Sequence, residues 1–210
     1  MDSEADGHHC TSGLNPWRAR CGEIRSAGSE GGPGKRIGRN ADTAPRSDPY
    51  TEHPARDGKV YCCAILDCFS RMIVARTFST TADTALVNNA VNMAVDNRTL
   101  SSPTILHADH GTQFTSWSFG ENMRRWGLLG SFGTVGDCFD NAAMESFWAR
   151  MQVELLNTRK WATTIELAAA MADYIDNFYN VERRHSYLGN ISPTEFETLW
   201  TSTYSIPQLA

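Results

Sequence analysis

An unbroken apolar run at residues 59–67 constrains the fold more than any other feature of this chain. It reads Lys-Val-Tyr-Cys-Cys-Ala-Ile-Leu-Asp, and its length and composition are those of a buried β-strand. Residues 68–71 fit a tight turn and residues 72–78, Met-Ile-Val-Ala-Arg-Thr-Phe, fit a second strand, so together they predict a hairpin. A short strand is also expected at residues 50–53, before a turn at residues 56–58.

Helices and strands alternate after this hairpin. Residues 81–97 carry apolar side chains at three- and four-residue spacings, the pattern of an amphipathic helix, and Thr81 fits its N-cap. The later elements are expected in the order strand, helix, strand, helix, helix and short helix, at residues 104–108, 116–126, 128–132, 141–157, 163–179 and 193–198. A hairpin followed by alternating helices and strands predicts a layered α/β fold on a mixed sheet.

Single residues predict where the later helices begin and end and which face they bury. Ser116 fits the N-cap of the second helix, which Gly127 ends, and Asp140 fits the N-cap of the third. In the long helix that follows, the apolar spacing predicts a buried face made of Leu167, Ala170, Met171, Tyr174 and Phe178.

Residues 1–47 differ in composition from the rest of the chain. They contain eight of the 16 glycines, and their few apolar residues follow neither a helical nor a strand period. Such a segment buries too little apolar surface to offset the entropy lost on ordering, so it is expected to be a disordered tail. The folded domain is expected at residues 48–200, followed by a C-terminal tail at residues 201–210.

Charge and cysteine usage exclude several classes of protein. The net charge of −5 argues against a dedicated DNA-binding domain, but not against a metal-dependent nuclease, because bound cations offset acidic groups. The six cysteines form no Cys-x-x-Cys pair, so a zinc site is not indicated and a reduced, cytoplasmic chain is expected. No apolar run approaches the ~20 residues of a membrane span, so no membrane partner is expected.

Two acidic residues are the first candidates for a functional site. Asp109 follows the strand at residues 104–108, and Glu145 lies within the third predicted helix. If the fold packs this helix against this strand, the two carboxylates can converge and hold a divalent cation. The alternatives are that both acids are ordinary surface residues, or that His107 and His110 belong to a zinc site.

Four motifs identify a family resemblance. They are Leu-Asp-Cys-Phe-Ser-Arg at residues 66–71, His-Ala-Asp-His-Gly-Thr-Gln-Phe-Thr-Ser at 107–116, Gly-Asp-Cys-Phe-Asp-Asn-Ala-Ala-Met-Glu-Ser-Phe-Trp at 136–148, and a polar segment at 180–197. Together they resemble the DDE transposases of the insertion-sequence-three group, which have a catalytic core of the retroviral-integrase type. The resemblance covers about residues 50–199 and implies an RNase H-like fold, with a central mixed five-stranded sheet flanked by helices.

The same resemblance implies an activity and its partners. The expected activity is metal-dependent cleavage and transfer of DNA strands in transposition, with Mg²⁺ or Mn²⁺ in a two-metal site. The expected partners are the DNA ends of a mobile element and its target DNA, with assembly of a homo-oligomer on the DNA. The expected location is the bacterial cytoplasm, at the nucleoid.

The resemblance also assigns roles to acidic residues. Asp109 and Glu145 correspond to the second and third acidic metal ligands of the family, while the first Asp of the family corresponds to Pro49. Asp48 precedes that position by one residue, a shift that on a strand moves a side chain by ~3.3 Å and onto the opposite face. Asp48 is therefore a displaced candidate ligand. Asp67 also ends a predicted strand, but its motif resembles the structural hairpin of the family.

Five polar or basic residues are expected to contact DNA. The candidate DNA-binding residues are His110, Gln152, Arg183, Arg184 and His185. Gln152 stands where many members of the family carry Lys or Arg, so its contact with a phosphate lacks the charge.

Residues 1–47 do not resemble the helical DNA-binding region that usually precedes this core, which suggests a truncated or frame-altered copy. The alternatives to an active transposase core are a decayed core that only binds DNA or co-assembles with a relative, and an RNase H-like nuclease.

Overall fold

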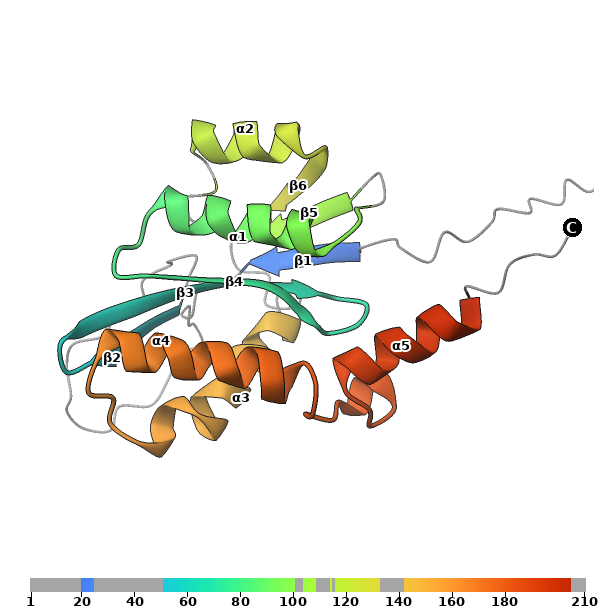
Figure 1. The fold of residues 1–210 in the computed structure, drawn as a ribbon. Coiled ribbons are helices and arrows are strands. Elements are labelled where there is room, and N and C mark those ends of the chain that lie inside the picture. The colour runs from blue at the N-terminus through green and yellow to red at the C-terminus, as the bar shows by residue number, and fades with distance from the viewer. Residues whose placement is uncertain are drawn as a thin grey trace, which may run out of the picture.

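A mixed β-sheet runs through the middle of the molecule, with helices on both of its faces (Figure 1). The computed structural model describes residues 20–24, 51–100, 104–108, 114, 116–132 and 142–204. The strands are β1 (Arg20–Ile24), β2 (Thr51–Ala55), β3 (Gly58–Asp67), β4 (Ile73–Ser79), β5 (Thr104–Ala108) and β6 (Leu128–Phe132). The α-helices are α1 (Thr84–Asn97), α2 (Trp117–Arg125), α3 (Ala142–Glu154), α4 (Thr164–Asp173) and α5 (Pro193–Tyr204).

The long strand β3 organises the sheet. One edge of β3 pairs antiparallel with β4. The other edge pairs antiparallel with β2 at residues 61 and 62 and with β1 at residues 65 and 66. β5 pairs parallel with β1, and β6 pairs parallel with β5. Six strands therefore fill five positions, with β1 and β2 end to end in the central one. This is the α/β sheet with a hairpin that the sequence predicts.

β1, the one part of residues 1–47 that the structure describes, differs from the expectation of a disordered tail. Its backbone pairs with β3 from Ile65 to Asp67 and with β5, so it supplies hydrogen-bond partners to two strands that would otherwise lack them. The segment Arg-Cys-Gly-Glu-Ile has no strand periodicity of its own, so only the long-range pairing identifies it. The rest of residues 1–47 lies outside the described residues.

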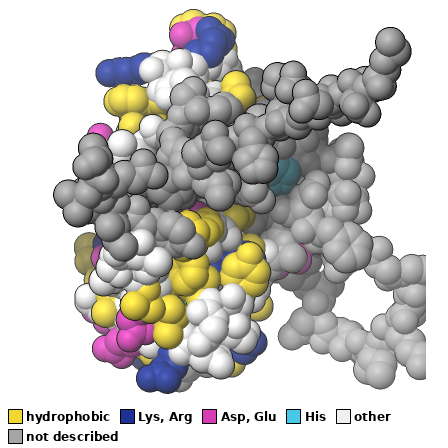
Figure 2. Space-filling model, turned by 90° about the vertical axis from the view of Figure 1, so that its right-hand side faces the viewer, with side chains coloured by type: hydrophobic (Ala, Val, Ile, Leu, Met, Phe, Trp, Pro, Cys, Tyr) yellow, Lys and Arg dark blue, Asp and Glu magenta, His cyan; other side chains and the backbone are white. Residues whose placement is uncertain are grey.

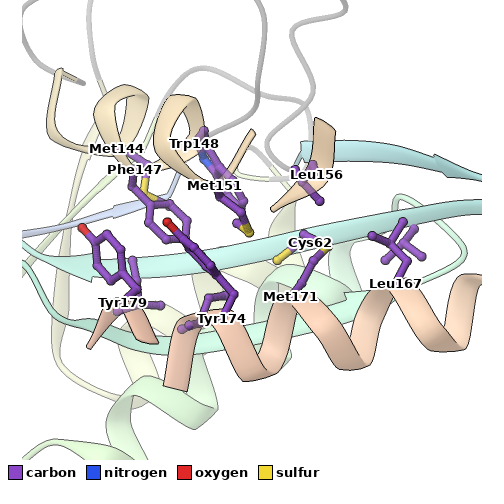
Figure 3. Close-up of a cluster of buried hydrophobic side chains, with 14 of the residues drawn as sticks. Cys62, Met144, Phe147, Trp148, Met151, Leu156, Leu167, Met171, Tyr174 and Tyr179 are labelled. Atoms are coloured by element: carbon purple, nitrogen blue, oxygen red, sulfur yellow. The ribbon is translucent and has the colours of Figure 1, made fainter. Parts of the chain in front are cut away.

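The two faces of the sheet carry separate hydrophobic cores. One core joins even-numbered residues of β3, such as Cys62, to α3, α4 and the segment after α4 (Figure 3). The other joins Cys63 and its odd-numbered neighbours to α1, α2 and β5. Both thiols are fully buried, and burial raises the pKa of Cys63 to about 12. Because both faces are covered by helices, the predicted continuous apolar run is confirmed as a strand buried on both sides.

The helix ends test the capping predictions. α1 begins at Thr84, and Oδ1 of Asp83 accepts the Leu86 N–H at 2.9 Å, so the prediction of Thr81 as N-cap is wrong. Asp83 is the N-cap because its carboxylate accepts the N–H of Leu86, three residues later. The hydroxyl of Thr81 instead donates to the Asp83 carboxylate. Ser116 caps α2 as predicted, and Gly127 has the left-handed conformation (φ +64°) that ends a helix.

A π-helical turn, Tyr174–Tyr179, follows α4 and changes which residues are buried. The N–H of Asn180 donates to the carbonyl of Ile175 at 3.0 Å, five residues back. The wider turn buries Ile175 and Tyr179 and leaves Phe178 39% exposed, so the predicted burial of Phe178 is wrong. The predicted burial of Leu167, Met171 and Tyr174 on the preceding α-helical turns is confirmed.

α5 packs on the turn that joins β3 to β4. Phe69 of that turn makes edge-on contacts with Phe196 and Trp200, at centroid distances of 5.2 Å and 4.9 Å. Figure 2 views the molecule from the side on which α5 lies, and hydrophobic side chains gather in the lower half of that face. Leu199 of α5 is 57% exposed. None of the helices in the described ranges has the length and apolarity needed to cross a bilayer.

Candidate active site

α3 has one buried face and one exposed face, and Glu145 lies on the exposed one. Glu145, Ala149 and Gln152 follow one another at spacings of four and three residues, and all three are exposed; we call them the exposed stripe. The residues that hold α3 in the core point the other way, namely Met144, Phe147, Trp148 and Met151 (Figure 3). The Glu145 carboxylate is thus carried by a helix whose position is fixed by packing.

β5 leads the chain to the second acidic position. It lies inside the sheet, with Ala108 paired to Ile24 of β1 and to Phe132 of β6. The predicted strand is therefore confirmed, and its last residue is buried. Asp109 follows it directly in the sequence, but Asp109 and His110 both lie outside the described residues, so their roles stay predictions.

His107, the other histidine of the zinc alternative, has a neighbour of its own. It is 5% exposed, and its Nδ1 lies 3.1 Å from Oγ of Ser131 on the adjacent strand β6. Across the described ranges, no three His, Cys, Asp or Glu side chains gather as a metal centre would require. The contact with Ser131 supports a packing role for His107.

β1 and β2 occupy the central position of the sheet, and Asp48, the candidate for the first acid, precedes β2 in the sequence. Thr51, the first described residue of β2, pairs with Cys62 of β3. Ile24 of β1 holds the place opposite Ile65. Asp48 and Pro49 themselves lie outside the described residues. The assignment of Asp48 as a displaced metal ligand therefore stays a prediction.

Asp67 is built into the β3–β4 turn. Its Oδ1 accepts the N–H of Phe69 at 2.8 Å, and its Oδ2 lies 3.8 Å from the guanidinium of Arg98. Its backbone carbonyl accepts the N–H of Arg71 at 2.7 Å. These contacts support the interpretation of Asp67 as a structural residue of the hairpin.

Arg183 forms an ion pair with Glu154 at the end of α3. It donates to Glu154 through Nη2 at 3.0 Å and through Nε at 3.1 Å, and the hydroxyl of Tyr174 donates to the same carboxylate at 2.7 Å. Burial alone would raise the pKa of Glu154, but these hydrogen bonds hold it below the ordinary value. The Nε and Nη2 edge of the guanidinium is thus engaged inside the protein, which supports a structural role for Arg183.

His185 lies on the same side of α3 as Arg183. Its ring meets the edge of Tyr179 at 4.8 Å, and Tyr179 in turn packs against Phe147 on the buried face of α3. Burial, helped by the nearby Arg183 charge, lowers the pKa of His185. The segment that contains the two residues is therefore stacked behind α3, on the face opposite the exposed stripe. Arg184, between them, is exposed.

The sequence reasoning missed a group of basic residues beyond the end of the exposed stripe. Arg56, Arg159 and Lys160 line a groove of ≈ 400 Å³ that also includes Gln152. We call it the basic groove. The sequence signal was the adjacent pair Arg159–Lys160, but nothing in the sequence indicated that Arg56, about a hundred residues earlier, lies beside it.

The acidic residues suit a hard divalent cation in their chemistry. Carboxylate oxygens are the ligands that Mg²⁺ and Mn²⁺ prefer, and Glu145 is exposed on α3. It also lies in the first turn of α3, where the helix dipole favours a negative charge. The described residues thus fit the cation in donor type.

Comparison with known proteins points to one family. Two profiles described as "Integrase core domain" match residues 47–138 and 127–193. The transposase for insertion sequence element IS904 of Lactococcus lactis is 33% identical over 144 residues, which cover 69% of this chain and 57% of that protein. Transposase InsF for insertion sequence IS3A of Escherichia coli K12 is 32% identical over 141 residues, covering 67% of this chain and 49% of that protein.

The fold also matches a solved structure. A chain of the simian T-cell lymphotropic virus intasome, solved with PP2A regulatory subunit B56 gamma, superposes with a TM-score of 0.53 at 11% identity. The match covers 77% of this chain and 54% of that one. At this identity the match supports the integrase-type, RNase H-like fold. The chain spans about half the length of the two transposases.

Proposed function

We propose that this chain, which belongs to the integrase core domain family of IS3-type transposases, cleaves and joins DNA strands with the help of divalent metal ions. It carries the transposase catalytic core of these elements. The substrates would be the DNA ends of a mobile element and the target into which they are inserted.

One observation carries this proposal. Glu145 stands on the solvent-facing stripe of a helix whose other face is locked into the core, while β5 ends inside the sheet immediately before Asp109. A carboxylate on a fixed helix and another at the end of a central strand provide rigid oxygen ligands of the kind metal-dependent phosphoryl transfer requires.

The residues have separate tasks in this scheme. Asp109 and Glu145 would hold the cation, and Asp48 is the displaced candidate for the third carboxylate. A bound divalent cation would activate the attacking oxygen and stabilise the leaving oxygen of the phosphodiester. Gln152, farther along the exposed stripe, would hydrogen-bond a phosphate of the bound DNA, and His110 would contact DNA beside Asp109. Two Mg²⁺ or Mn²⁺ ions are expected if all three carboxylates take part.

The test is a strand-cleavage and strand-transfer assay on duplexes that carry the ends of the element. Products are followed on denaturing gels with Mg²⁺, with Mn²⁺ and with EDTA. We expect metal-dependent cleavage that Asp109→Asn and Glu145→Gln each abolish. Cleavage that persists in EDTA, or in both variants, would overturn the proposal.

A second candidate function is an inactive core that binds DNA or co-assembles with an active relative. The observation that favours it is the proline at residue 49, which corresponds to the first acid of the family. The Pro49→Asp variant separates the two candidates. Activity in the parent chain excludes the inactive core, whereas activity only in the variant establishes it.

The remaining expectations concern specificity, assembly and place. Cleavage of an RNA–DNA hybrid in preference to element ends would favour the RNase H-like nuclease alternative, which the family assignment makes the weaker one. We expect oligomers to form on paired DNA ends, since an intasome contains the chain with the matching fold. The place of action is the bacterial nucleoid, where the DNA substrate is.

A further inference from the structure

The basic groove is a concave surface lined by three basic residues. Its walls include the guanidinium groups of Arg56 and Arg159 and the ammonium group of Lys160, while none of its lining residues is acidic. Gln152 and Asn157 add amide groups. Three cations and two amides, with no carboxylate, match an anionic ligand that also accepts hydrogen bonds.

The walls of the groove are held together by hydrogen bonds between distant segments. The N–H of Arg56, next to the β2–β3 turn, donates to the carbonyl of Trp161 at 3.1 Å. Oδ1 of Asp57 accepts the N–H of Thr164 at 2.8 Å, at the start of α4. In Figure 1 this turn and the start of α4 lie at the same end of the molecule, away from α5. The groove is thus formed before any ligand arrives, which lowers the cost of binding.

The three cations differ in how strongly they are engaged. The guanidinium of Arg159 lies 4.2 Å from the ring centroid of the buried Trp161 and 3.2 Å from the Glu166 carboxylate. Arg56 and Lys160 are exposed and form no ion pair with any residue of the described ranges. Their charges are therefore available to an incoming anion at little cost in broken contacts.

A buried histidine adds a polar group at the floor of the groove. His53 is 5% exposed, lines the groove, and its Nε2 has no hydrogen-bond partner among the described residues. Burial lowers the pKa of His53 to about 4, so the ring is neutral at pH 7 and contributes hydrogen-bonding capacity without charge. A buried ring nitrogen without a partner is costly unless a ligand or water reaches it.

The groove continues the exposed stripe. Gln152 belongs to both, and its Nε2 donates to Oδ1 of Asn157 at 2.6 Å inside the groove. Gln152 lies seven residues after Glu145, which on a helix is a rise of ~10 Å, comparable to the rise of about three base pairs along the axis of a DNA duplex. One DNA backbone can therefore pass both the Glu145 carboxylate and the basic groove.

We propose that the basic groove binds the DNA backbone a few nucleotides from the phosphodiester that reacts, with Arg56 and Lys160 contacting successive phosphates. This inference rests on the proposed function, because it assigns to the DNA of that reaction a path over α3. It adds residues that the four sequence motifs do not contain. It also explains how a chain with a net charge of −5 binds a polyanion, through a local concentration of positive charge.

The test measures binding without cleavage, so that its failure is distinguishable from failure of the proposed function. The affinity of the full chain for a fluorescein-labelled 30-base-pair duplex is measured by anisotropy in EDTA over a range of KCl concentrations. For the double variant Arg56→Gln with Lys160→Gln, we expect a Kd at least roughly tenfold weaker near 0.1 M salt. We also expect the slope of log Kd against log salt to fall by about 1.8, or about 0.9 per lost contact.

The control removes equal charge elsewhere. The variant Arg124→Gln with Arg125→Gln changes two exposed cations of α2, on the other face of the sheet, and should leave the slope unchanged. Lys160→Arg should keep the wild-type slope. Equal losses in both double variants, or an unchanged slope in the groove variant, would overturn the proposal. So would a groove variant that loses affinity only for an RNA duplex of the same length.

Discussion

The exposed stripe of α3 and the segment stacked behind α3 differ in their surroundings, although Glu145 of the stripe and the residues of that segment all belong to motifs that resemble the family. Glu145 and Gln152 face solvent, while Arg183 and His185 pack against Glu154 and Tyr179 on the buried side. The difference shows that the residues of a sequence motif are constrained for two different reasons. One is chemistry performed on a surface, and the other is the packing that holds the surface in place.

The strongest test of this division is at Glu145. We expect Glu145→Gln to reduce metal-dependent strand cleavage by roughly 100-fold or more, about 2.7 kcal/mol of barrier, because an amide is a poor ligand for the cation. Stability should change by less than about 0.5 kcal/mol, since the side chain is exposed. Denaturing gels and urea unfolding measure the two quantities, in the parent chain and in the Pro49→Asp background. A loss of stability with full activity would reverse the assignment of the two faces.

Behind α3, the largest expected effect on stability is at Asn180. Its side chain accepts the N–H of Ile73 at 2.9 Å and donates to the Ile73 carbonyl at 3.0 Å, in a buried site. Asn180→Ala would leave both backbone groups of a sheet strand without a partner, at a cost of ~2–4 kcal/mol. Urea unfolding measures the loss. Asn177→Ala, an exposed change on the same π-helical turn, should cost under about 0.5 kcal/mol, and an equal loss in both would contradict this role.

A pH effect is expected from His53, which packs near Trp148 on the buried face of α3. Burial lowers its pKa from 6.5 to about 4, so the unfolded chain binds a proton more readily than the folded one between these values. The contribution to stability is complete above pH 6.5 and is lost as the pH falls towards 4, by about 2–3 kcal/mol. Unfolding free energies at pH 7, 5.5 and 4.5 measure it. The His53→Leu variant should lose this dependence, and an identical pH profile in that variant would contradict the assignment.

A smaller effect separates Arg183 from its neighbour Arg184. Arg183→Gln should cost about 1 kcal/mol, because it removes a two-pronged ion pair that is partly screened by solvent. The matched variant Arg184→Gln should be neutral in thermal unfolding, since Arg184 is exposed. If Arg184→Gln weakens DNA binding while Arg183→Gln does not, the division between surface and packing extends to adjacent residues. A loss of stability that is larger for Arg184→Gln than for Arg183→Gln would contradict this division.

The smallest expected effect is a gain at Gln152. Gln152→Lys places a charge on the exposed stripe, where a phosphate contact would steepen the salt dependence of DNA binding by about 0.9. The anisotropy measurement on the 30-base-pair duplex detects a several-fold tighter Kd at about 0.1 M salt. Thr198→Lys on α5, also exposed, is the control for charge alone. Equal gains in both variants would mean that the stripe has no special place in the DNA path.

Most of the strands and helices were predictable because their signals are local. The apolar run of β3, the stripe of α1 and the Ser116 cap each depend on hydrogen bonds or spacings within a few residues. The exceptions have identifiable causes. Asp83 displaced Thr81 as a cap through geometry at a single turn, and the π-helical turn shifted the buried face by one residue, so that Phe178 was misplaced.

The candidate site divides in the same way. Motifs and spacing identified Glu145 and Asp109 and predicted the helix and strand that carry them, and both elements are confirmed. No local signal showed that Arg183 is paired with Glu154, 29 residues earlier, or that Arg56 lies beside Trp161. The basic groove could not be predicted, because it is made by two segments that only the packed sheet and helices bring together.

The sequence alone therefore determined the family and nearly all of the described secondary structure, while the acidic ligands that it names stay predictions. The tertiary structure decided which of the described motif residues face solvent, and it placed β1 between β3 and β5 in the sheet. The physical reason is the range of the interactions. Helical periodicity and capping depend on residues within one or two turns of each other. The hydrogen bond between Asn180 and the backbone of Ile73, in contrast, joins residues 107 positions apart. Such contacts exist only once the whole core has formed.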